Sequence, residues 1–171
     1  MGLFDFLKDK DKNSSQETKE GKVYSPVNGK LVAIDEVADP VFSQKMMGDG
    51  FAVIPTDGDI YSPVDGKVMS VFPTKHAVGI AMDNGVEVLV HMGLDTVELE
   101  GKPFTTTVTE GQEVTKDTKI STVDLEALAA AEKDNAMVVV FTNMDKVGSF
   151  DMIDSGSTVT AAGDIGSVTA K

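Results

Sequence analysis

The two histidines of this chain, His76 and His91, are the side chains best suited to chemistry at neutral pH. An imidazole can act as a nucleophile, a general base or a metal ligand, because its reference pKa lies near 6.5. The chain has no cysteine, which excludes a thiol nucleophile, and neither a phosphate-binding Gly-x4-Gly-Lys-Ser/Thr loop nor a Gly-x-Ser-x-Gly turn. The remaining chemistry is a histidine nucleophile that forms a covalent phosphoryl intermediate, while the second histidine stabilises the phosphoryl oxygens.

Two other interpretations of the histidines stay open. Residues 91–95 (His-Met-Gly-Leu-Asp) match His-x3-Asp, one half of a zinc peptidase signature. The companion His-x-His is missing, and a catalytic zinc normally has three protein ligands, so a metallopeptidase is the weaker interpretation. A histidine in an apolar strand can also be a half-buried side chain with no catalytic part. We expect no bound metal and no cofactor.

A predicted hairpin brings the two histidines together. Residues 76–82 and 87–92 have the pattern of strands, and Asn84-Gly85 between them is typical of a two-residue type I′ turn. This turn places His91 opposite Val78, so that His76 and His91 are diagonal neighbours on one face. A three-residue loop would put them on opposite faces, because a register shift of one residue reverses every side chain.

Residues near the histidines in the sequence can fix their tautomers. Thr74 and Asp95 carry oxygen atoms that can hydrogen-bond an imidazole. Gly93 allows the backbone to approach His91 closely.

Charge and composition limit the partners. The net charge is −13, and the chain contains no arginine, so nucleic acid is not an expected partner. An acidic surface instead helps to steer basic proteins toward it. No run approaches the roughly 18 apolar residues of a membrane span, and charges near the N-terminus occupy the place of a signal peptide's apolar core. We expect a cytoplasmic monomer.

The chain divides into a tail and one domain. Residues 8–22 carry no large apolar side chain, which predicts a flexible N-terminal tail over residues 1–20 and a single domain over 21–171. Leu3, Phe4 and Leu7 share a helical face, so weak contact of residues 1–8 with a membrane surface is an open alternative to disorder.

An internal repeat indicates the fold class. Residues 24–30 (Tyr-Ser-Pro-Val-Asn-Gly-Lys) return as residues 61–67 (Tyr-Ser-Pro-Val-Asp-Gly-Lys), with six of seven positions identical. Asn-Gly and Asp-Gly predict type I′ hairpins, so the core is expected to be a duplicated hairpin unit in an antiparallel β-sandwich. We also expect a helix over 125–133 capped by Asp124, a buried strand over 136–142, and two strands around Gly163-Asp164.

Residues 73–99 closely resemble enzyme IIA of the glucose family, a soluble phosphocarrier of the bacterial phosphoenolpyruvate–sugar phosphotransferase system. The motifs are Pro-Thr-Lys-His-Ala at 73–77, Asn-Gly-Val-Glu at 84–87 and Leu-Val-His-Met-Gly-Leu-Asp-Thr-Val-Glu-Leu at 89–99. The likeness covers about residues 21–170, including Asp-Pro-Val-Phe at 39–42, Met-Gly-Asp-Gly at 47–50 and Asn-Met-Asp at 143–145. It implies an all-β fold, an antiparallel β-sandwich or duplicated barrel-sandwich hybrid with one or two short helices.

The resemblance also implies roles for residues. The Nε2 atom of His91 would take a phosphoryl group from the phosphohistidine of the carrier protein HPr and pass it to a cysteine of a sugar-specific IIB domain. His76 would support the transfer, with Thr74 hydrogen-bonded near it. Asp39 and Asp95 match acidic residues that meet basic side chains of partners.

The apolar docking rim of the family falls on seven positions, most of which the sequence pattern by itself would assign to the core: Val41, Phe42, Met46, Met47, Phe72, Val78 and Met92. Some members of the family share a zinc ion with a partner through the two histidines, but nothing in this sequence establishes such a site. The competing interpretation is a non-catalytic regulatory binding module of the same fold. The sequence does not identify the sugar.

Overall fold

The computed structural model describes residues 19–171. The predicted contact of residues 1–8 with a membrane, and nearly all of the predicted tail over 1–20, lie outside the described residues. Within residues 19–171, no helix is both long and apolar enough to cross a membrane.

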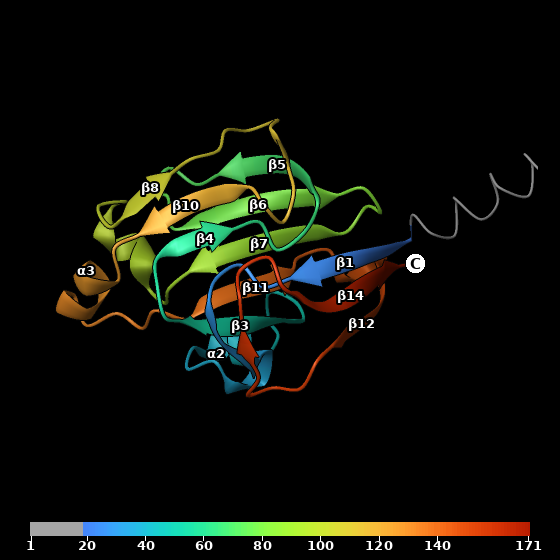
Figure 1. Ribbon diagram of the computed structural model, residues 1–171, viewed down its shortest axis with the longest axis horizontal. Helices are drawn as coiled ribbons and strands as arrows, with labels where there is room; N and C mark the ends of the chain where they lie inside the picture. The colour runs from blue at the N-terminus through green and yellow to red at the C-terminus, as the bar shows by residue number, and fades with distance from the viewer. Residues whose placement is uncertain (1–18) are drawn as a thin grey trace, which may run out of the picture.

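The described chain forms one large and two small antiparallel sheets (Figure 1). The large sheet contains, in spatial order, β13 (Thr158–Val159), β2 (Gly29–Ala33), β3 (Gly50–Pro55), β11 (Met137–Phe141), β7 (Glu87–Met92), β6 (Ala77–Met82), β5 (Gly66–Val71) and β9 (Glu113–Val114). One small sheet contains β1 (Glu20–Tyr24), β14 (Asp164–Ala170) and β12 (Val147–Met152), and the other contains β4 (Asp59–Tyr61), β10 (Lys119–Val123) and β8 (Phe104–Thr106). The predicted antiparallel all-β class is confirmed.

The central strands of the large sheet, β3, β11, β7 and β6, carry buried side chains on both faces. One face packs against the two small sheets around side chains such as Phe51, Ile80, Ile120 and Ile165, and these form the principal core. The opposite face packs a smaller apolar cluster, which we call the outer cluster, under η1 (Ile34–Glu36) and α2 (Pro40–Ser43). In Figure 1, α2 lies beside β3.

The second helix follows the predicted pattern. α3 (Leu125–Ala130) begins after Asp124, whose carboxylate accepts a hydrogen bond of 3.1 Å from the Ala127 N–H. It ends earlier than predicted, because Glu132 takes a left-handed conformation and the chain turns there toward β11. All five residues of β11 are buried, as predicted. The two strands expected around Gly163-Asp164 are present: β13 precedes Gly163, and β14 begins at Asp164.

The repeat does not form hairpins, so that prediction is wrong. Its first copy joins β1 to β2 and its second joins β4 to β5, and each copy links strands of two different sheets. The two copies bond to each other reciprocally: the Tyr24 N–H donates to the Pro63 carbonyl and the Tyr61 N–H donates to the Pro26 carbonyl, both at 2.7 Å. Gly29 and Gly66 allow a neighbouring strand to pass close to the backbone. A Cβ at either position would overlap a carbonyl oxygen of that strand.

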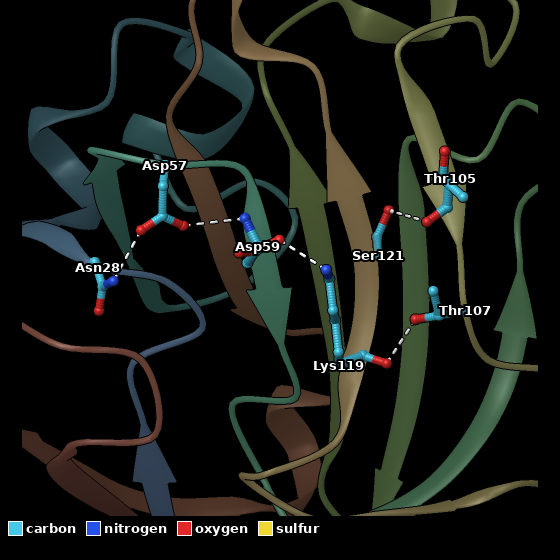
Figure 2. Close-up of polar contacts among 7 residues, drawn as sticks. All are labelled: Asn28, Asp57, Asp59, Thr105, Thr107, Lys119 and Ser121. Atoms are coloured by element: carbon cyan, nitrogen blue, oxygen red, sulfur yellow. Dashed lines mark hydrogen bonds and ion pairs between the residues drawn. The ribbon is translucent and has the colours of Figure 1, made fainter.

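Polar contacts explain the one difference between the copies (Figure 2). The side-chain N–H of Asn28 donates to Asp57 at 2.8 Å, and Asp57 also accepts from the Asp59 N–H. An aspartate at position 28 would face that carboxylate without a proton to donate. Asp59 then pairs with Lys119 of β10 at 2.7 Å, so these contacts tie the first copy to the sheet that contains β4, β10 and β8.

Candidate functional site

His91 lies on β7, on the face of the large sheet that carries the outer cluster. Val88, Val90 and Met92 point into the principal core, and strand alternation turns Leu89 and His91 to the opposite face. Ala77 lies opposite His91 on β6, and its small side chain leaves room for the imidazole. The Phe42 ring packs edge-on against the imidazole with ring centroids 5.1 Å apart. The imidazole is therefore half-buried on an apolar base.

The loop after β7 fixes the tautomer of His91. The Nδ1 atom lies 2.7 Å from the Gly93 carbonyl oxygen, which can only accept, so Nδ1 carries the proton. Gly93 has a φ of +82°, its N–H donates to Ala136, and the hydroxyl of Thr96 donates to the Met92 carbonyl at 2.7 Å. The Nε2 atom of a neutral His91 therefore keeps its lone pair.

Burial lowers the pKa of His91. The hydrogen bond to Gly93 and the negative charges of Asp39 and Asp95 oppose this shift without reversing it. His91 is consequently neutral at neutral pH, which is the form that a nucleophile requires.

His76 is held by the turn that precedes β6. The Lys75 N–H donates to the Phe72 carbonyl at 2.7 Å, and Lys75 has a φ of +59°. The Thr74 hydroxyl lies 2.6 Å from Nδ1 of His76, and the Phe72 ring packs edge-on against the imidazole with centroids 5.4 Å apart. Burial lowers the pKa of His76, and a positive charge on His91 would lower it further.

The two imidazoles meet, with ring centroids 5.0 Å apart, but not for the predicted reason. The loop between β6 and β7 spans residues 83–85 rather than two residues, so His91 pairs with Ala77 and not with Val78. The Gly85 N–H donates to the Met82 carbonyl, and Gly85 has a φ of +94°. These features define a type I turn followed by a left-handed residue.

The three-residue loop does not separate the histidines, because His76 belongs to the turn before β6 and escapes the alternation of the strand. The loop is held by Asn143, whose side chain accepts from the Glu87 N–H at 2.7 Å and donates to the Gly85 carbonyl at 2.9 Å. The sequence singled out Asn143 only through the resemblance.

Two carboxylates lie near the histidines. Asp39 is half-buried and caps α2 by accepting from the Val41 N–H at 2.9 Å, while Asp95 is exposed with a φ of +56°. Both line a surface depression together with Pro40 and Leu94. No hydrogen bond joins Asp95 to an imidazole within residues 19–171, so the expectation that it fixes a tautomer is wrong for His91, where the Gly93 carbonyl does so.

The expected apolar docking rim divides by exposure. Val41, Met46 and Phe72 are exposed, and Met47 is half-buried against the outer cluster. Phe42 is buried beneath His91. Its ring supports the imidazole and has almost no surface that could contact a partner.

Val78 and Met92 have no exposed surface, so the expectation that they contact a partner is wrong. Both point into the principal core, on the face of the sheet opposite to Ala77 and His91. The sequence analysis did not consider Val97, a further apolar residue that is 48% exposed and lies two residues beyond Asp95. The only sequence signal for it is an apolar residue within a polar turn.

Among residues 19–171, no three or more histidine, aspartate or glutamate side chains are grouped so that they could hold a metal ion. The geometry at His91 is that of a neutral imidazole with one fixed and one free nitrogen.

A family model described as "phosphoenolpyruvate-dependent sugar phosphotransferase system, EIIA 1" matches residues 21–147, which is most of the chain. The chain belongs to this family. The resemblance seen in the sequence is thereby confirmed, and with it the prediction of an EIIA phosphocarrier component of the sugar phosphotransferase system.

Relatives of this EIIA chain support the assignment. A protein of Halalkalibacterium halodurans named glucose-specific EIIA component is 44% identical over 165 residues, covering 96% of this chain and 94% of its own length. A Staphylococcus aureus protein of the same name is 40% identical, covering 82% and 85%. The structure of glucose permease IIA from Mycoplasma capricolum superposes with a TM-score of 0.79 at 39% identity, covering 87% of this chain and 96% of that one.

One relative is much longer. A Streptococcus pneumoniae protein named glucose-specific EIICBA component is 57% identical over 136 residues, which are 80% of this chain. The matched part is 19% of that protein's length, so this chain corresponds to about one fifth of it.

Proposed function

We propose that this EIIA chain relays a phosphoryl group through His91. The Nε2 atom attacks the phosphorus of phosphohistidine on HPr, a new N–P bond forms, and the imidazole of HPr leaves. A cysteine thiolate of a sugar-specific IIB domain then takes the phosphoryl group from Nε2. The observation that supports this most is the hydrogen bond from Nδ1 of His91 to the Gly93 carbonyl, which leaves Nε2 free as the nucleophile.

His76 and Thr74 have supporting parts in this proposal. If the Thr74 hydroxyl donates to Nδ1 of His76, the proton of the neutral imidazole sits on Nε2. That N–H can then donate to an oxygen of the phosphoryl group on His91, because the two rings are neighbours. A charge-assisted hydrogen bond of this kind stabilises the transferred group during both steps.

The proposed docking surface consists of an acidic pair and an apolar rim around His91: Asp39 and Asp95, with Val41, Met46, Met47, Phe72 and Val97. The carboxylates repel a phosphoryl group, so they suit contact with basic side chains of the partners rather than with the phosphate. The net charge of −13 would steer such basic partners toward the chain.

We further propose that the sugar is glucose and that the protein acts in the cytoplasm as a monomer. The support for glucose is that relatives covering nearly their whole length carry the name glucose-specific. We also propose a domain over 21–171 preceded by a tail, and the start of the family match, which covers residues 21–147, supports the first boundary.

The test is transfer of ³²P from phosphorylated HPr to the wild-type chain and to His91→Gln. The wild-type chain should become labelled with an acid-labile phosphoryl group, and the variant should take up no label, because an amide is not a comparable nucleophile. The variant His76→Gln is the matched control, since it makes the same change on the neighbouring ring. A regulatory module without chemistry would leave the wild-type chain unlabelled, and label on His91→Gln would mean that another residue is the acceptor.

A further inference from the structure

The most exposed large apolar side chain among residues 19–171 is Met46, at 70% of its full exposure. The chain contains no cysteine, so its thioethers are its only oxidisable sulfur groups. Met82, Met92 and Met137 are buried, whereas Met69 and Met144 are exposed to 44% and 39%. An oxidant in solution therefore reaches Met46 more freely than the other methionines in the described part of the chain.

Met46 is joined to the phosphorylation site by a short, continuous set of contacts. Its N–H donates to the Val41 carbonyl at 3.1 Å, which closes the turn after α2. The next residue, Met47, packs against the outer cluster, which contains Phe42, and the Phe42 ring packs against His91. The thioether of Met46 is thus carried by the same short segment that supports the catalytic imidazole.

We propose that Met46 is a site of reversible oxidation to methionine sulfoxide, and that this oxidation weakens docking of the phosphoryl donor. The inference rests on the proposed relay function. With hydrogen peroxide as the oxidant, a lone pair of the sulfur attacks one peroxide oxygen, an S–O bond forms, and the O–O bond breaks with release of water. The sulfur loses two electrons and the peroxide gains them.

The sulfoxide changes the surface at the point where apolar contact is needed. A thioether is a soft apolar group, whereas a sulfoxide carries a strong hydrogen-bond acceptor that stays solvated in the free protein. Docking against an apolar partner surface would remove that water without replacing its hydrogen bond. The expected result is donor binding weaker by about tenfold or more, and methionine sulfoxide reductase would reverse it.

The test treats the wild-type chain, Met46→Leu and Met69→Leu with dilute hydrogen peroxide. Peptide mass mapping then locates the added oxygen, and the rate of phosphoryl uptake is measured against the concentration of phosphorylated HPr. Met46→Leu keeps an apolar side chain that peroxide does not oxidise, and each variant is compared with its own untreated sample. Met69→Leu is the matched control, since Met69 on β5 is the next most exposed methionine of residues 19–171 and is not among the residues assigned to the docking surface.

In the wild-type chain and in Met69→Leu, the oxygen should appear on Met46 before any other methionine of residues 19–171. KM for phosphorylated HPr should then rise about tenfold or more while kcat changes little. Met46→Leu should keep its untreated KM, and the reductase should restore the wild-type value. An unchanged KM with Met46 fully oxidised, or an equal rise in Met46→Leu, overturns the inference. Absence of phosphoryl uptake before any peroxide is added would instead overturn the proposed relay, and this inference with it.

Discussion

Gly93→Ala tests whether the loop after β7 prepares His91 for reaction. Gly93 has a φ of +82°, and its carbonyl accepts the hydrogen bond from Nδ1 of His91. A Cβ at this position would lie 2.6 Å from the Cγ2 atom of Thr96 and 3.0 Å from the Asp134 carbonyl oxygen. The Thr96 methyl group and the backbone at Asp134 would both have to move, and the Gly93 carbonyl would move with them.

The size of the effect follows from two separate terms. A left-handed conformation costs an L-residue about 1–2 kcal/mol. The steric overlap adds the cost of an overpacked site, about 1–3 kcal/mol. Gly111→Ala supplies the control, because Gly111 has a φ of +86° but a Cβ there would have no neighbour within 4 Å. Gly93→Ala should therefore lower the free energy of unfolding by about 2–5 kcal/mol, and Gly111→Ala by about 1–2 kcal/mol.

The assay pairs urea denaturation of both variants with their rates of phosphoryl uptake from HPr, measured where each variant is folded. Loss of the fixed Nδ1 hydrogen bond should slow uptake in Gly93→Ala by up to about tenfold, because such a bond contributes about 0.5–1.5 kcal/mol. Gly111→Ala should accept phosphate at the wild-type rate. If the two variants were equally stable and equally fast, the structural account of the Gly93 loop would be refuted.

The remaining predictions concern the histidines. His76→Gln should accept phosphate on His91 yet pass it to IIB about 10²-fold more slowly, since an amide cannot shift its proton and charge during transfer; onward transfer at the wild-type rate would contradict this. Burial lowers the pKa of both imidazoles in the folded protein. Below about pH 6.5 the unfolded chain therefore binds more protons than the folded protein does, and the free energy of unfolding falls as the pH decreases. Urea midpoints at pH 8 and pH 5 should therefore differ less in a His76→Gln/His91→Gln variant than in the wild-type chain.

Local signals in the sequence predicted single elements well and long-range pairing poorly. Asp124 followed by strong helix formers identified α3, and an unbroken apolar run identified β11, because capping and burial act within a few residues. The glycines at 29 and 66 were wrongly assigned to type I′ turns. Their actual cause is a neighbouring strand passing close to the backbone, which no local pattern reveals.

The candidate site was predicted correctly in its pairing of His76 with His91 and incorrectly in its register. Asn84-Gly85 is compatible with both a two-residue and a three-residue loop, and Asn143 holds the longer one from a distant part of the chain. The predicted proximity of the two histidines is correct despite the wrong register, because His76 lies in a turn outside β6. The shifted register also explains Val78, which pairs with Val90 and points into the principal core. Met92 follows His91 on the same strand and lies on the opposite face in either register, so only the family resemblance had assigned it to the rim.

The reciprocal bonds between the two copies of the repeat have the symmetry of a contact between identical subunits. Tyr24 bonds to Pro63 as Tyr61 bonds to Pro26, which is how a patch meets its own copy across a twofold axis. In this chain both halves of the contact belong to one polypeptide. Because the two halves are parts of one polypeptide, their sequences can differ. Both histidines follow the second copy of the repeat. The proposed phosphorylation site therefore belongs to only one of the two related halves, although the contact between the repeat copies is symmetric.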